Sequence, residues 1–131
     1  MKSNRPKRRR AAALVETALV LSILIVLAFG LFEYGLQFHV INCMTNAARD
    51  AARVLAVQGG TAQQAQTTAL NELSGINAAF TVTATTSAPD SSGNQDVTVQ
   101  ISVPKSSVSL GIVSSASGQL VEKATMRKEG N

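Results

Sequence analysis

The sequence predicts an α+β fold in which a long N-terminal helix, membrane-embedded over its first half, continues into a small outer domain. Two observations predict it. Residues 11–36 are almost wholly apolar, whereas residues 80–103 contain two stretches in which apolar and polar side chains alternate. With 131 residues, the chain can form one small domain beside the membrane segment. We expect a basic cytoplasmic leader (1–11), a transmembrane helix (12–36), its continuation outside the membrane (37–58) and an α+β domain (59–131).

The apolar run is long enough to cross a bilayer. As a helix, residues 12–32 would rise about 32 Å, and the hydrocarbon core of a bilayer is about 30 Å thick. Each Leu, Ile, Val or Phe favours insertion by about 0.3–0.6 kcal/mol, and a central carboxylate opposes it by about 2.5–3.5 kcal/mol. Because Glu16 lies near the end of the run, the apolar side chains prevail and the segment is predicted to insert.

The distribution of charge predicts the topology. Six of the twelve basic residues lie in the first ten positions, and the rest of the chain sums to −2. A basic run directly before an apolar span indicates a cytoplasmic N-terminus, so residues after 32 lie outside, and nucleic-acid binding is not expected. Residues 1–10 are predicted to be disordered, since they lack apolar periodicity and contain Pro6.

The helix is predicted to continue to Val57, because residues 37–57 contain neither Pro nor Gly and Gly59-Gly60 follow. Its outer half carries small side chains four residues apart, which would let another helix or a sheet lie close, namely Ala47, Ala48, Ala51 and Ala52. Arg49 and Arg53 are also four apart, and Asp50 is placed to pair with Arg53. These charges form either a solvated face or a subunit contact.

The remaining segments predict the small domain. Thr61 and Gln64 form a capping box that opens a short helix over 61–73. Strands are predicted at 80–85, 97–103 and 120–127, in an antiparallel sheet covered by the two helices. Residues 106–115 fit a strand, a loop on the membrane surface or a helical turn, and the charged end, 127–131, is expected to fray.

Other residues of the apolar segment predict contacts with lipid or with other helices. Glu33 and Tyr34 mark the outer membrane interface, where a charge and an aromatic ring can both reach water. Gly30 and Gly35 allow close approach of another helix, although their spacing is not that of a GxxxG pair. A signal peptidase exit at Ala28-Phe29-Gly30 is the weaker interpretation, because the apolar run continues past it.

Residues 11–57 resemble the TadE-like family, the minor pilins or pseudopilins of tight-adherence (Tad/Flp) pili. The resemblance lies in Val15-Glu16, the apolar block, the run from Gly30 to Gly35 and the run NAARDAAR at 46–53. It implies that a prepilin peptidase cuts between Ala11 and Ala12, which makes Glu16 the fifth mature residue. Two positions depart from the family pattern: Ala11 replaces the usual glycine, and Thr17 replaces the usual aromatic residue after the glutamate.

The resemblance implies a non-enzymatic structural role in pilus assembly or a related secretion machine of the bacterial inner membrane. Other pilin subunits, the prepilin peptidase, the Tad membrane platform and the bilayer are the implied partners, and Glu16 and Thr17 lie where subunits would meet. The alternative is a single-pass envelope anchor whose outer domain binds another protein. With one His and one Cys, and no phosphate loop or nucleophile elbow, the sequence predicts no catalytic residues, metal, cofactor or small-molecule substrate. Cys43 is interpreted as an apolar filler or an intermolecular disulfide partner.

Overall fold

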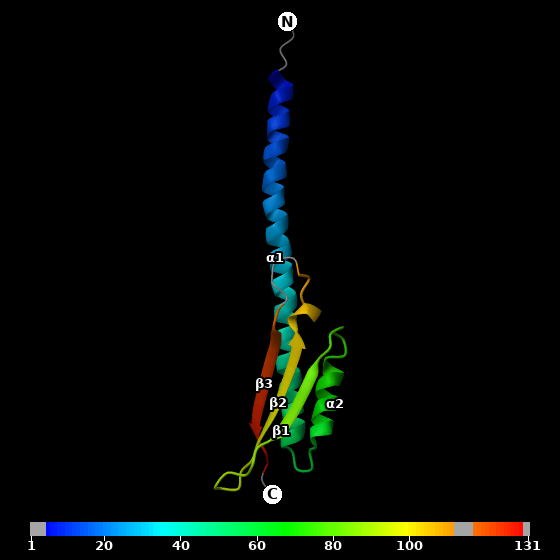
Figure 1. Cartoon of the computed structure of the whole chain (residues 1–131), viewed down its shortest axis with the longest axis vertical. Helices are drawn as coiled ribbons and strands as arrows, with labels where there is room; N and C mark the ends of the chain where they lie inside the picture. Colours follow the sequence, from blue (N-terminus) through cyan, green and yellow to red (C-terminus); the bar gives the residue numbers. More distant parts are fainter. Residues whose placement is uncertain (1–4, 112–116, 130–131) are drawn as a thin grey trace.

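The chain forms one long helix with a small two-layer domain packed around its second half, in a computed structural model that describes residues 5–111 and 117–129 (Figure 1). The elements, in chain order, are α1 (Arg5–Ala56), α2 (Ala62–Glu72), β1 (Thr81–Thr86), β2 (Asp96–Pro104), the 3-10 turn η1 (Lys105–Ser107) and β3 (Gln119–Arg127). This is the α+β fold that the sequence predicts.

Helix α1 has 52 residues and is therefore about 78 Å long. It begins at Arg5, so the prediction of a disordered leader is wrong from that residue on; residues 1–4 lie outside the described part. Pro6 is tolerated because it falls in the first turn, where a backbone N–H has no partner within the helix. The helix ends before two glycines, as predicted. Gly59 has a φ of +79°, and a Cβ at Gly60 would lie 2.1 Å from the carbonyl oxygen of Val54.

Helix α2 opens with the predicted capping box. The backbone N–H of Gln64 donates to Thr61 Oγ1 at 3.2 Å, and the N–H of Thr61 donates to Gln64 Oε1 at 3.1 Å. The helix then buries Ala65 and Ala69 against α1 and the sheet. Two reciprocal hydrogen bonds thus fix the direction in which the chain returns after the glycine turn.

The three strands form an antiparallel sheet in the order β1-β2-β3, and their bounds lie within a residue or two of the predicted ones. Val82 lies opposite Ile101, and Val99 opposite Ala124. Alternate residues of the central strand are fully buried, namely Val97, Val99, Ile101 and Val103. Each such side chain contributes about 1.5–3 kcal/mol when it leaves water, so β2 supplies much of the core.

The two helices cover one face of this sheet, as the sequence predicts. Helix α1 contacts α2, β2 and β3, and α2 also contacts β1. The buried apolar residues of α1 recur at helical spacing along its second half. They are Val40, Met44, Ala47, Ala48, Ala51, Ala52, Leu55 and Ala56. The domain core is therefore built around the second half of α1 and leaves the first half without a cover among the described residues (Figure 1).

The end of the chain is tied to the rest of the domain. The N–H of Lys128 donates to the carbonyl oxygen of Gln95 at 2.8 Å, and the N–H of Glu129 to that of Ala56 at 2.9 Å. Arg127 is paired with Asp96 in the sheet, so the prediction of a frayed end is wrong for residues 127–129. Residues 130 and 131 lie outside the described part. The last carbonyls of a helix have no partner within it, and Glu129 supplies one to the end of α1.

Candidate functional site

The most distinctive surface of the molecule is the exposed apolar half of α1. Every residue from Arg10 to Phe29 is exposed, and the large apolar side chains among them include Leu14 at 72 % and Leu19 at 62 %. Helix residues Arg10–Ala56 form the one span in the described part that is long and apolar enough to cross a membrane, and its most apolar window is 0 % buried. This helix fits a membrane anchor. In water so many uncovered side chains would be unfavourable, so the surface requires lipid or protein contact.

Two hydroxyl groups on this apolar surface form hydrogen bonds within the helix, whereas one carboxylate does not. The hydroxyls of Thr17 and Ser22 each donate to the carbonyl oxygen four residues earlier, those of Ala13 and Ala18, both at 2.8 Å. Such bonds satisfy a hydroxyl without water. Glu16 is exposed, and no ion pair or hydrogen bond joins it to another described residue. Such a carboxylate on an apolar helix either lies at headgroup level, near Arg10, or meets a partner on another chain.

At the outer end of the apolar run, Glu33 and Tyr34 have different environments. Tyr34 is exposed at 64 %, but the side chain of Glu33 is only 1 % exposed and accepts a hydrogen bond from the hydroxyl of Ser109. The expectation that the Glu33 carboxylate reaches water is therefore wrong. The segment after η1 therefore reaches this carboxylate, and the hydrogen bond joins residues 76 positions apart.

The small residues on the outer half of α1 pack within the chain itself. Ala47, Ala48, Ala51 and Ala52 are at most 1 % exposed, and they lie in the core formed with α2 and the sheet. Arg49 and Arg53 point away from this core. Arg53 Nη1 lies 3.7 Å from Asp50 Oδ1, with both side chains largely in solvent. The small alanine side chains thus let α2 and the sheet of the same chain pack closely against α1.

Gly35, one of the two predicted glycine contacts on α1, presents an open surface. A Cβ at Gly35 would meet nothing within 4 Å. Gly35 lines a shallow, almost wholly apolar hollow with Ala28, Leu31, Phe32 and Leu36. The described chain therefore leaves a notch on α1 beside large exposed side chains, a shape into which a side chain of another helix can fit.

Two carboxyl groups meet where α2 packs on α1. Burial, followed by the negative charge of Asp50 and a hydrogen bond with it, raises the pKa of Glu72 above its ordinary value. The folded state therefore binds this proton more tightly than the unfolded chain does. The resulting contribution to stability is fully present below the ordinary pKa and is lost as the pH rises through the raised value.

Replacing Glu72 by glutamine is expected to stabilise the outer domain at neutral pH and to have no effect at pH 3. The expected gain in the free energy of unfolding is about 0.2–0.5 kcal/mol, because solvent screens the repulsion between Glu72 and Asp50. Chemical unfolding of the detergent-solubilised chain at both pH values measures it. In an Asp50→Asn background the same substitution should gain less. An equal gain in both backgrounds would show that Asp50 is not the cause.

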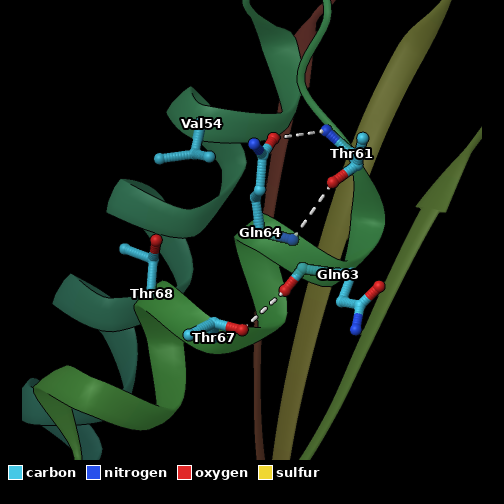
Figure 2. A pocket seen from close by; sticks show the side chains of 6 residues that line it. All are labelled: Val54, Thr61, Gln63, Gln64, Thr67 and Thr68. Atoms are coloured by element: carbon cyan, nitrogen blue, oxygen red, sulfur yellow. Dashed lines mark hydrogen bonds between the residues drawn. The ribbon is translucent and has the colours of Figure 1, made fainter.

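Other polar groups of the described part have local structural roles. Cys43 Sγ lies 3.7 Å from His39 Nε2 one turn earlier, and no group of three or more His, Cys, Asp or Glu in the described ranges could hold a metal. Asp90 accepts hydrogen bonds from the N–H groups of Asn94 and Ser92 at 2.9 and 2.8 Å, which lower its pKa and hold the β1–β2 loop. The hollow in Figure 2, between α1 and α2, includes the capping residues Thr61 and Gln64.

Sequence reasoning missed Ser109, whose hydroxyl donates a hydrogen bond to Glu33. A signal was present, since residues 106–118 contain no charged side chain although they belong to the outer domain. One of the alternatives predicted for this stretch was a loop on the membrane surface. It forms the turn η1 and then a bend to Gly111, and residues 112–116 lie outside the described part.

Comparison with known proteins gives a family match that covers most of α1. No curated protein and no solved structure matches the chain. The family model of TadE-like proteins matches residues 11–53, which include the exposed apolar span, Glu16 and the alanine-rich start of the domain core. The resemblance to TadE-like proteins is therefore confirmed over residues 11–53.

Proposed function

We propose that this protein is a TadE-like minor pilin or pseudopilin, a non-enzymatic structural component of a Tad/Flp pilus or a related secretion machine. The observation that carries the proposal is the coincidence of two properties in one segment. Residues 11–53 match the TadE-like family, and the first half of that segment is an uncovered apolar helix projecting from a folded domain. A subunit of this shape can pack sideways through its helix while its domain stays outside the membrane.

Glu16 guides this packing in the proposed mechanism. Cleavage between Ala11 and Ala12 creates a new amine four residues before Glu16, on the same side of the helix. In a low-dielectric environment the carboxylate and an amine attract each other strongly, so the amine of a neighbouring subunit would fix the register between two helices. Thr17 stands beside this contact, and its hydroxyl is already bonded to Ala13, so it adds no unmatched polar group.

The same proposal assigns an orientation. The basic residues before Ala11 stay in the cytoplasm, the helix over residues 12–36 spans the bacterial inner membrane, and the outer domain is periplasmic or extracellular. The prepilin peptidase and the Tad platform act on the membrane-embedded half. Gly30 and the notch at Gly35 offer contacts to neighbouring pilin helices, and Arg49 and Arg53 offer charged contacts outside the membrane.

Mass spectrometry of the mature N-terminus tests the proposal. We expect a terminus at Ala12 when the prepilin peptidase is present and an uncleaved leader when it is deleted. Because the peptidase family usually meets glycine before the cut, Ala11→Gly should increase the processed fraction without moving the terminus. An intact leader in the wild-type strain, or a terminus beyond Gly30, would instead support the single-pass anchor or a signal peptide.

A further inference from the structure

The segment that follows β2 reaches along α1 toward its membrane half. After η1 the chain continues past the ends of the strands beside α1 (Figure 1). Between Ser106 and Gly118 no residue is charged. Ser109 and Val108 are half-buried, whereas Leu110 is 51 % exposed. The segment therefore presents a large apolar side chain to its surroundings while its neighbours pack on the protein.

Hydrogen bonds fix this segment at the end of the apolar span. The hydroxyl of Ser109 donates to the buried carboxylate of Glu33 and accepts from the N–H of Gly111 at 3.0 Å. Gly111 has a φ of +68°, a conformation that favours glycine. The glycine at this position therefore permits the bend after Leu110. The polar groups at this bend are thus partly satisfied within the protein.

Leu110 follows Ser109, which is bonded to Glu33, so it lies at the level of α1 where the exposed apolar run ends. Glu33 directly follows Leu31 and Phe32, which are 81 % and 60 % exposed, and the aromatic rings of Tyr34 and Phe38 are exposed at 64 % and 65 %. Exposed aromatic residues at the end of an apolar helix are typical of the membrane–water interface. The bond between Ser109 and Glu33 therefore holds the exposed Leu110 at the level of α1 that carries these exposed aromatic residues.

We propose that residues 106–111 form a second membrane contact, in which Leu110 enters the outer headgroup and acyl boundary while Ser109 and Glu33 fasten the segment to α1. Lipid is the occupant because Ser109 is bonded to Glu33 at the end of the predicted membrane span, and residues 106–111 carry no charge. The inference depends on the membrane insertion of α1, which is part of the proposed function. Attachment at two points would restrict the tilt of the outer domain relative to the bilayer.

Tryptophan fluorescence can test this contact, because the chain has no tryptophan of its own. The full chain carrying Leu110→Trp is reconstituted into phosphatidylcholine–phosphatidylglycerol vesicles, with or without bromine on the acyl chains. We expect a blue-shifted emission, loss of most of it in brominated lipid, and protection from aqueous iodide. Since Leu110 is half-exposed, the larger ring is accommodated without disturbing the core, and thermal unfolding verifies this.

Matched tryptophans separate the inference from the insertion of the helix. Phe29→Trp, within the span, should be quenched by brominated lipid, and Thr83→Trp, exposed on β1, should not. If Phe29→Trp is quenched and Leu110→Trp behaves like Thr83→Trp, the second contact is wrong while insertion stands. If neither is quenched, insertion itself fails. A blue shift at Leu110→Trp that grows with the protein-to-lipid ratio and resists brominated lipid would show that another subunit covers the segment.

The role of Glu33 is tested in the same Leu110→Trp chain. Glu33→Leu removes the acceptor for Ser109, and we expect the segment to leave α1, with loss of lipid quenching and a gain in iodide quenching. Glu33→Gln keeps an acceptor oxygen, so it should retain the wild-type behaviour. Equal lipid quenching in both variants would show that the hydrogen bond does not position the segment.

Discussion

Glu16→Ala is expected to abolish incorporation of the protein into pili or their assembly complex while leaving its membrane insertion intact. Insertion is preserved because removing a carboxylate from an apolar span only favours the membrane, where a charge opposes insertion by up to about 2.5–3.5 kcal/mol. Assembly is lost because no other described carboxylate lies on the exposed apolar half between Arg10 and Phe32. Membrane fractionation measures the first effect, and copurification with the other pilin subunits measures the second.

Ser22→Ala is the matched control for that experiment. It also removes a polar group from the exposed face of the span, but the Ser22 hydroxyl is bonded to the carbonyl oxygen of Ala18 and carries no charge. We expect normal insertion and normal assembly. Unchanged pili in the Glu16→Ala strain would contradict the role proposed for Glu16. Loss of assembly in the Ser22→Ala strain would show that assembly is sensitive to the loss of any polar group from the span.

Ala51→Leu is expected to lower the free energy of unfolding of the outer domain by about 1–3 kcal/mol, the usual effect of overpacking a closed core. Ala51 is 0 % exposed where α1 meets α2 and the sheet, so a larger side chain has no space without moving an element. Denaturant unfolding of the full chain in detergent, followed by circular dichroism, measures the change.

Arg49→Leu introduces the same side chain two residues earlier, on the exposed face of the same helix. It should change the free energy of unfolding by no more than about 0.5 kcal/mol. The two variants therefore distinguish an internal packing role of the alanines from a subunit contact. If Ala51→Leu kept its stability but lost its pilin partners, the alanines would belong to an intermolecular interface.

Features fixed by neighbouring residues could be predicted from the sequence. The uninterrupted apolar run and its flanking charges predict a long helix that fits a membrane anchor, and the alternation at 97–103 predicts the central strand. The Thr61 capping box and the two glycines before it predict where α1 ends and α2 begins. Each of these depends on backbone geometry or hydrogen bonding over a few residues, so a local pattern was sufficient.

Features that depend on distant contacts could not be predicted in this way. A helical pattern shows that Ala47 and Ala51 share a face, but only the packed sheet and α2 decided that this face is closed within the chain. The same holds for Glu33, which its position predicts to be an interfacial charge but which is buried in the structure and bonded to Ser109. The sequence by itself determined the elements and the apolar half of α1; the tertiary structure decided which surfaces remain free, because that depends on which distant segments pack together.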